Sequence, residues 1–274
     1  MKEVRREVVK KCPCCRSSSI LRSFDDWNGI TYQVCKDCKS IFQNPIIIFK
    51  YEENYWGSVV DPDGKKRDLK SEKEFKIKNW YGDTINYVNN LSPGKILDVG
   101  AGLGFFLSAI NSEWEKYALE VSNNAVKFME DQYDDISVQQ GLLEEADFGG
   151  KQFDVIMFYH VIEHLQNPVE ILNILHKLIK HNGVLIVGTP NIGSLASIIF
   201  KGNFRLYGPG HLCLFNPKSI SKVLSESGFR IFHREYPFLK TDYATIKNFT
   251  RMFNLNQISP PFYGNLMTVY ARKK

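Results

Sequence analysis

The stretch that decides the fold is Lys95-Ile-Leu-Asp-Val-Gly-Ala-Gly-Leu-Gly-Phe-Phe106. It begins with an apolar run, interrupted only by Asp98, which is typical of a buried parallel strand. Three glycines at alternate positions follow, and then apolar residues at helical spacing. Glycine suits such a turn because it tolerates unusual backbone angles and lets a ligand approach the bare backbone. The stretch predicts a strand, a tight turn and a helix, with a ligand at the turn.

The pattern of short apolar runs and helical segments continues to the end of the chain. A helix expected from Pro168 ends at the turn signal Asn182-Gly183, and a second is expected from Pro217 to Ser227. Further strands are expected near residues 117–119, 136–138, 153–158, 184–187, 229–232 and 265–270. Strands that alternate with helices predict a parallel, doubly wound α/β sheet.

The spacing Asp-x-Gly-x-Gly-x-Gly resembles the first motif of class I S-adenosylmethionine-dependent methyltransferases. Phe105 stands where a dinucleotide-binding fingerprint needs a small residue, so NAD is disfavoured. The segment Phe153–Pro168, with its Val-Ile-Glu-His-Leu-x-Asn-Pro run, looks like the fourth motif of small-molecule methyltransferases. The resemblance covers residues 91–274. It implies a Rossmann-like seven-stranded sheet whose last strand, about residues 265–272, is antiparallel.

The resemblance also implies where the cofactor binds. The glycine turn would hold the methionine moiety, and Glu120, at the end of the next strand, would accept the ribose hydroxyls. Leu142 replaces the aspartate that often contacts adenine, which leaves the backbone and two leucines for the base. The expected cofactor-binding residues are Asp98, Gly100, Ala101, Gly102, Gly104, Glu120, Val121, Leu142, Leu143 and Tyr159.

Four residues are candidates for the chemistry: His160, Glu163, His164 and His211. The first three are spaced i, i+3, i+4, and share one face if the segment is helical. A histidine could act as general base, or the group could hold a divalent ion. A similar Glu-x-x-Glu-His arrangement binds metal in ubiquinone-type O-methyltransferases, and a later histidine completes the site in small-RNA 2′-O-methyltransferases. A purely structural role for the segment is the third alternative.

The N-terminal part carries a metal-site spacing. Cys12-x-x-Cys15 and Cys35-x-x-Cys38 are separated by nineteen residues, which fits a closed four-thiolate zinc site with a structural role. Strands around Asn28-Gly29 predict a hairpin, so this part looks like a zinc ribbon. Cys14 is an alternative ligand, and Cys213 is expected in the core.

Three parts are therefore expected: a zinc ribbon (1–48), a connector with a covering helix (49–92) and the cofactor-binding domain (93–274). The helix is expected to begin at Ser71, the N-cap of a capping box with Glu74, and the aromatic residues Tyr51, Tyr55 and Trp56 are candidate lid residues. The net charge of +5 is diffuse, and neither a signal peptide nor a membrane-spanning run is evident. A cytoplasmic protein without membrane contact is predicted.

These observations predict a methyltransferase that acts on a polar small molecule. Ribbon and methyltransferase together resemble sugar C-methyltransferases, which suggests a sugar or surface-glycan precursor, with O-methylation slightly preferred over C-methylation. Two alternatives stay open at this stage. One is an RNA methyltransferase whose ribbon binds nucleic acid. The other is a cofactor-binding module without catalytic activity.

Overall fold

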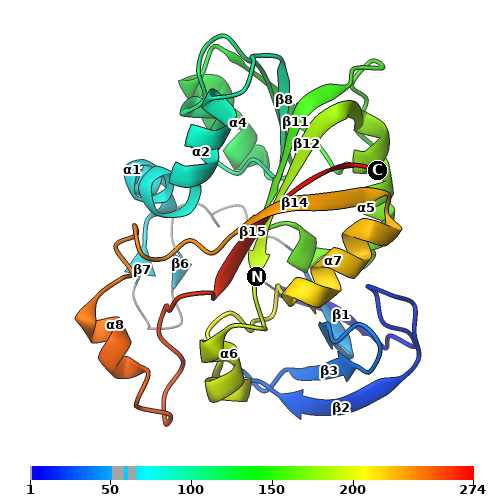
Figure 1. Cartoon of the computed structure of the whole chain (residues 1–274), viewed down its shortest axis with the longest axis vertical. Coiled ribbons are helices and arrows are strands. Elements are labelled where there is room, and N and C mark those ends of the chain that lie inside the picture. Colours follow the sequence, from blue (N-terminus) through cyan, green and yellow to red (C-terminus); the bar gives the residue numbers. More distant parts are fainter. Residues whose placement is uncertain (1, 51–58, 61–65) are drawn as a thin grey trace.

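The computed structural model describes residues 2–50, 59–60 and 66–274 (Figure 1). The candidate lid residues Tyr51, Tyr55 and Trp56 lie outside the described residues. None of the described helices combines the length and the apolar character that a membrane span requires.

A seven-stranded sheet forms the centre of the molecule. Its order is β10-β9-β8-β11-β12-β15-β14, with β15 antiparallel to both of its neighbours. The strands are β8 (Lys95–Val99), β9 (Glu115–Glu120), β10 (Ile136–Gln140), β11 (Phe153–Tyr159), β12 (Ile179–Pro190), β14 (Phe229–Glu235) and β15 (Leu266–Lys273). The predicted Rossmann-like sheet with an antiparallel last strand is confirmed.

Helices cover both faces of the sheet, as a doubly wound fold requires. Apolar residues of α2 (Gly82–Asn89), α3 (Phe105–Ser108) and α4 (Asn123–Gln132) share a buried cluster on one face. Those of α5 (Pro168–Leu178) and α7 (Pro217–Glu226) belong to the cluster on the other. The expectation that the helix from Pro168 ends at Asn182-Gly183 is wrong, because α5 ends at Leu178 and β12 begins with the next residue.

The covering helix precedes β8 and has four segments: η1 (Leu69–Glu72), α1 (Lys73–Lys76), the π-helical η2 (Ile77–Tyr81) and α2. The expected N-cap Ser71 is wrong. Asp68 caps the helix instead, because its side chain accepts the backbone N–H of Lys70, while the Ser71 hydroxyl donates to the Asp68 carbonyl. Both residue types cap well, so the local sequence could not decide between them.

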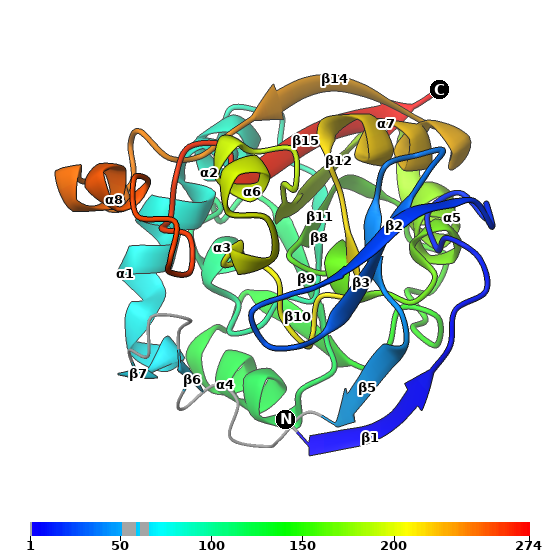
Figure 2. The ribbon, with the colours of Figure 1, turned by 90° about the horizontal axis from the view of Figure 1, so that it is seen from below.

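The N-terminal part forms two small sheets. One pairs β1 (Lys2–Glu7) with β5 (Ile46–Lys50). The other has the order β13-β4-β3-β2 and contains β2 (Ile20–Asp25), β3 (Thr31–Cys35), β4 (Ile41–Gln43) and β13 (Cys213–Leu214). The predicted hairpin at Gly29 is therefore present, and β13 comes from far along the chain. Figure 2 shows the hairpin of β2 and β3 lying across the lower end of the main sheet.

Segments that follow the carboxyl ends of the strands complete the lower part of the molecule (Figure 1). After β12 come α6 (Leu195–Phe200) and η4 (Lys201–Asn203), and β14 is followed by α8 (Ile246–Arg251). Among the described residues, β6 (Val59–Val60) and β7 (Lys66–Arg67) form a separate two-stranded ribbon, and η3 (Ile162–His164) follows β11. The turn after β8 and the loops after β9, β11 and β12 thus meet at one edge of the sheet.

Candidate active site

The glycine turn after β8 has the backbone that a close-approaching ligand needs. Gly100, Gly102 and Gly104 have φ values of +75°, +56° and +71°, which favour glycine. A Cβ at Gly100 would lie 2.5 Å from Cγ2 of Val161, so the turn packs tightly against the loop after β11. The turn continues directly into α3. Ala101 is a half-buried residue of the turn.

Glu120 lies directly beside this turn. One carboxylate oxygen accepts the Gly102 N–H at 2.8 Å and the other accepts the Ser122 N–H at 2.9 Å. Burial raises the pKa of Glu120, and these two bonds oppose the shift. Burial and the nearby Glu120 charge raise the pKa of Asp98 to about 8. The two acids predicted from their strand ends are thus brought together at the turn.

The neighbouring ends of β9 and β10 carry the residues expected around the adenine. Gln140 is paired with Glu120, so Val121 and Leu142 follow adjacent strand ends. Both are exposed apolar side chains, 45% and 52% accessible. Leu143 is buried in the core on one face of the sheet, which leaves Leu142 as the leucine available to a ligand.

Tyr159 joins the end of β11 to the covering helix. Its hydroxyl lies 3.1 Å from the Trp80 carbonyl and 3.2 Å from the Thr268 hydroxyl, and its ring contacts Tyr81. A Cβ at Gly188 would lie 2.2 Å from the Tyr159 ring. Tyr159 is therefore a buried support of the site. Burial raises the pKa of Tyr81, and the nearby Asp98 charge raises it further, which places Tyr81 near Asp98.

Glu163, in η3 just after β11, is a fully buried carboxylate. His160 Nδ1 lies 2.9 Å from one oxygen, and the Thr189 hydroxyl donates to the other at 3.2 Å. Burial works to raise its pKa, but the hydrogen bond from His160 and the neighbouring imidazoles outweigh burial and lower the pKa to about 2. An ionised carboxylate in such surroundings needs a cation or proton donor beside it.

His164 and His211 converge on this carboxylate. One ligand atom from each of the three side chains lies within 4.8 Å of the others. The Nδ1 atoms of His164 and His211 lie 2.7 Å and 2.6 Å from backbone carbonyls of Gly210 and Leu206. Nδ1 must carry a proton to donate there, so the neutral ring has its lone pair on Nε2, as in metal-binding histidines. Burial and the nearby His164 lower the pKa of His211 to about 4.

His160 plays a different part from the helical partner that its spacing suggested. Its φ is +56°, and the segment after it is the short η3, so the expected shared helical face does not form. Its backbone N–H donates to the Gly188 carbonyl, and its ring packs edge-on against Trp80 at 5.4 Å. The His160 Nε2 atom is buried without a hydrogen-bond partner among the described residues.

The model of the methyltransferase domain family matches residues 76–234, which is more than half of the chain. The chain belongs to this family. A Rickettsia canadensis protein named ubiquinone biosynthesis O-methyltransferase is 24% identical over 202 residues, 66% of this chain and 80% of that protein. A Mycolicibacterium smegmatis protein named "Probable S-adenosylmethionine-dependent methyltransferase" is 24% identical over 138 residues, 50% of this chain. The chain spans about half the length of the latter relative, 52%.

Solved methyltransferases share the fold at low sequence identity. Magnesium protoporphyrin IX methyltransferase from Synechocystis, with bound S-adenosylhomocysteine, has a TM-score of 0.54 and 14% identity, and the match covers 77% of this chain and 90% of that chain. An S-adenosylmethionine-dependent methyltransferase from Archaeoglobus fulgidus has a TM-score of 0.53 and 22% identity, with 75% and 99% covered. These likenesses confirm the class I fold.

The N-terminal sheet holds the turn that carries His211, through residues of β3 and β4. The Gln43 amide donates to the carbonyls of Gly208, Pro209 and His211 at 3.0, 3.1 and 3.2 Å. The Tyr32 hydroxyl donates to the Gly208 carbonyl at 2.9 Å. The Tyr207 ring, just before this turn, is buried against other aromatic rings.

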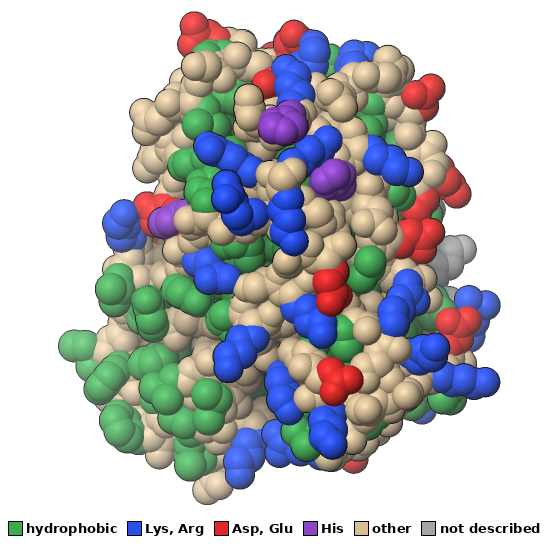
Figure 3. Space-filling model, turned by 45° about the vertical axis from the view of Figure 1, so that its right-hand side comes forward, with side chains coloured by type: hydrophobic (Ala, Val, Ile, Leu, Met, Phe, Trp, Pro, Cys, Tyr) green, Lys and Arg blue, Asp and Glu red, His purple; other side chains and the backbone are tan. Residues whose placement is uncertain are grey.

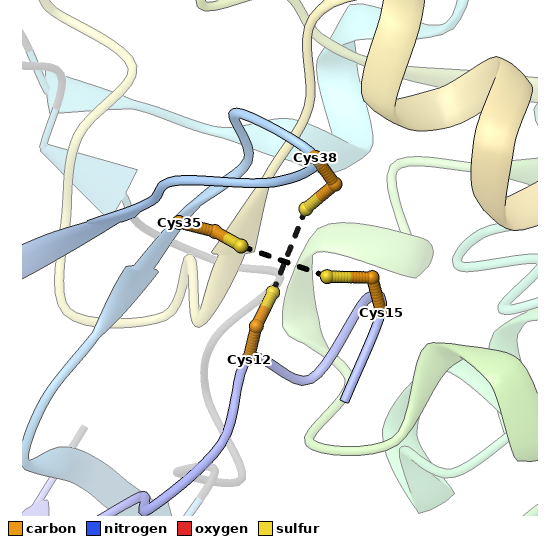
Figure 4. A group of neighbouring side chains, drawn as sticks. All are labelled: Cys12, Cys15, Cys35 and Cys38. Atoms are coloured by element: carbon orange, nitrogen blue, oxygen red, sulfur yellow. Dashed lines mark hydrogen bonds between the residues drawn. The ribbon is translucent and has the colours of Figure 1, made fainter. Parts of the chain in front are cut away.

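Cys12, Cys15, Cys35 and Cys38 come together at the base of the hairpin of β2 and β3 (Figure 4). Cys12 and Cys38 Sγ lie 3.6 Å apart, and Cys15 and Cys35 Sγ lie 3.5 Å apart. Four sulfurs about 2.3 Å from one zinc ion would lie about 3.8 Å from one another, so the group fits the ion. Burial and neighbouring thiols raise the pKa of Cys15 to about 11, a shift that a bound cation would reverse.

Cys14 lies apart from this group. Its Sγ is 2.6 Å from Cys213 Sγ, and both residues are fully buried. The structure therefore brings Cys15, and not the alternative Cys14, into the four-thiol group.

Several residues near the site were not predicted from the sequence. Thr189 bonds Glu163, Trp80 covers His160, and Gln43 holds the His211 turn. Thr189 follows the Val184–Val187 run, so its place at a strand end was the available signal. Trp80 and Gln43 act across contacts distant in sequence, for which the sequence offers no local signal.

Proposed function

We propose that this chain transfers a methyl group from S-adenosylmethionine to an oxygen of a polar small molecule. The observation that carries the proposal is the convergence of Glu163, His164 and His211 next to the loop whose Val161 packs against the glycine turn at Gly100. A nucleoside site and a group of oxygen-activating residues then lie at the same sheet edge. The relatives named O-methyltransferases support transfer to oxygen.

The residues at the turn fit the cofactor. The bare backbone of the glycine turn would receive the methionine part, Glu120 would accept the ribose hydroxyls, and the exposed side chains of Val121 and Leu142 would flank the base. When bound, S-adenosylmethionine supplies an electrophilic methyl group on a sulfonium. Methyl transfer is an in-line displacement, so the protein contributes mainly by positioning donor and acceptor.

The acceptor oxygen must lose its proton during transfer to a hydroxyl. In their neutral rings, His164 and His211 carry the lone pair on Nε2, and the lowered pKa of His211 keeps that ring neutral at neutral pH. Either ring could take the proton, which contributes about 10²–10⁴ in rate. The same atoms with Glu163 fit a divalent ion, and imidazole ligands favour zinc, manganese or iron over magnesium. Such an ion lowers the pKa of a bound hydroxyl.

We further propose zinc as the structural ion of the four cysteines and a sugar or glycan precursor as the acceptor class. The ribbon would support the His211 turn through Gln43 and Tyr32, which gives the module a role in the site. The sugar assignment rests on the likeness of the whole arrangement to sugar methyltransferases and on the polar character of the site.

A transfer assay with methyl-labelled cofactor tests the proposal, with nucleotide sugars, polyols and catechols as acceptors. We expect label on oxygen with the wild type, and a loss of about 10²-fold or more with His164→Ala. His181→Ala, on the exposed start of β12, is the matched control and should keep full activity. Label on carbon or nitrogen would overturn O-methylation. Cofactor binding without transfer to any acceptor would support the non-catalytic alternative instead.

Metal content, measured by mass spectrometry on protein without a histidine tag, separates the two roles of the histidines. One zinc ion in both the wild type and His164→Ala supports a general base. A second divalent ion that is lost only in His164→Ala supports metal-assisted transfer.

A further inference from the structure

An apolar surface lies at the sheet edge that carries the candidate active site. Two segments that follow this edge, residues 193–216 and 236–265, hold nine of the fifteen exposed large hydrophobic side chains among the described residues. Single exposed apolar residues are ordinary, but a cluster of this kind marks an interaction surface. We call the outer faces of α6, α8 and the turn after α8 the α6–α8 surface; its exposed members are Leu195, Ile198, Ile199, Ile246, Phe249, Phe253 and Leu255.

The two helices form one body although they are distant in sequence. Met252, at the end of α8, is buried in the same cluster as Ala196 and Phe200 of α6. The Ser259 N–H donates to the Asn203 carbonyl at 2.8 Å, which fixes the chain after α8 against η4. The inner faces are thus packed while the outer faces stay apolar and accessible. Figure 3 shows apolar side chains gathered over the lower left of the molecule.

The most exposed members project strongly. Ile246 and Phe253 are 83% and 76% accessible; Ile246 begins α8, and Phe253 lies in the turn after it. Aliphatic and aromatic side chains in such positions can enter the boundary between lipid headgroups and acyl chains. Neither α6 nor α8 exceeds six residues, so contact with lipid would be made by a few side chains and not by a long helix.

The charge of the two segments is strongly one-sided. They contain five basic residues, Lys201, Arg205, Lys240, Lys247 and Arg251, and a single acid, Asp242. Asp242 pairs with Lys78 of the covering helix at 2.5 Å, and Lys240 pairs with Asp83 of α2 at 2.8 Å. Lys201 and Lys247 are exposed and place positive charge beside the apolar residues. A second copy of this chain would bring the same cations against one another, which is unfavourable. An anionic surface with an apolar layer beneath it complements both properties.

We propose that the α6–α8 surface docks the protein onto an anionic phospholipid membrane. Apolar side chains would enter the interface, and the basic residues would lie at the level of the phosphates. The sequence analysis predicted no membrane contact because no apolar run approaches the length of a membrane span. The docked protein would present the carboxyl edge of its sheet, and hence the candidate active site, toward the lipid.

Vesicle flotation with the full chain tests this docking without an assay of activity. Vesicles of phosphatidylcholine and phosphatidylglycerol are compared with vesicles of phosphatidylcholine alone. We expect the wild type to float with the anionic vesicles, and we expect binding to weaken as salt is raised. Absence of binding to anionic vesicles, or equal binding to both kinds, would overturn the proposal.

Two sets of variants locate the contact. Phe249→Ser/Phe253→Ser should lower the partition coefficient by about tenfold or more, because two aromatic side chains no longer enter the interface. Phe232→Ser, which removes an exposed phenylalanine from β14, is the matched control and should bind like the wild type. Equal loss in the variant and the control would contradict a contact at α6 and α8.

Both lysines of the charge variants are exposed, so the substitutions remove no buried side chain. Lys201→Glu/Lys247→Glu should lower binding by about tenfold or more. Lys127→Glu/Lys218→Glu, on exposed positions elsewhere, makes the same change in net charge and should have a smaller effect. Light scattering is measured in parallel: a dimer that Phe249→Ser/Phe253→Ser dissociates would overturn the lipid assignment in favour of self-association.

Discussion

The substitution Gly100→Ala tests how closely the glycine turn is fitted to the rest of the site. The added methyl group has two separate costs. Gly100 has φ +75°, where a residue with a side chain loses about 1–2 kcal/mol. The new Cβ would also lie 2.5 Å from Val161 Cγ2, whereas ordinary carbon contacts are about 3.5–4.0 Å. One of the two segments must therefore move by about 1 Å.

A matched control separates these costs. Gly29, in the hairpin turn, has φ +73°, but a Cβ there would meet nothing within 4 Å. Gly29→Ala should therefore lower the free energy of unfolding by about 1–2 kcal/mol through backbone strain alone. Gly100→Ala should lose about 1–3 kcal/mol more, the usual cost of overpacking. Because the strain falls on the turn itself, affinity for S-adenosylhomocysteine should fall by about tenfold or more in Gly100→Ala only.

Urea unfolding and titration calorimetry measure the two quantities. The double variant Gly100→Ala/Val161→Ala removes the clashing methyl group and should recover the overpacking part of the loss, as read from a double-mutant cycle. If Gly100→Ala matches Gly29→Ala in both stability and affinity, the reasoning from the close packing of the turn and the Val161 loop is refuted.

Three further predictions concern other parts of the molecule. The raised pKa of Asp98 means that the folded protein keeps a proton which the unfolded chain loses, so the free energy of unfolding should fall as pH rises from about 4 to about 8. Asp98→Asn should remove that part of the fall in urea titrations at each pH, and an unchanged profile would contradict it. Cys15→Ser should bind less zinc, as measured by metal analysis, and should unfold at a lower temperature, whereas Cys213→Ser should keep its zinc. Equal loss of zinc in both variants would argue against the four-thiol group. Gln43→Ala should keep the thiol-bound zinc but weaken any second divalent ion near His211, because the supporting turn loses three hydrogen bonds; retention of both ions at wild-type affinity would rule out that support.

The sequence predicted those features that neighbouring residues determine. The apolar run before the glycine turn and the turn itself are local patterns, and the strands after them have their predicted order and type. Glu120 was predicted as a site residue because it ends a strand. In a parallel sheet, the end of that strand lies beside the glycine turn. The spacing of the two cysteine pairs was sufficient to predict the group of four thiols.

Features that depend on distant contacts could not be predicted in the same way. His211 was a candidate through the resemblance alone, and it reaches Glu163 because the chain after β12 returns along the N-terminal sheet, where β13 pairs with β4 as an edge strand. His160 does not lie on a helical face with Glu163 and His164, because it adopts a left-handed backbone conformation and its backbone N–H donates to the Gly188 carbonyl. Leu143 turned inward beside an exposed Leu142, and periodicity alone does not distinguish these two orientations in a short turn.

The central claim is that the turn after β8 and the acid after β9 form a nucleoside site. Calorimetric titration with S-adenosylhomocysteine tests it most directly, on the wild type, on Glu120→Ala and on the control Glu113→Ala, an exposed acid before the same strand. The account predicts a single bound molecule per chain in the wild type and in Glu113→Ala, with binding at least about tenfold weaker in Glu120→Ala, which loses a charge-assisted contact. Absence of binding in the wild type, or unchanged affinity in Glu120→Ala, would contradict it.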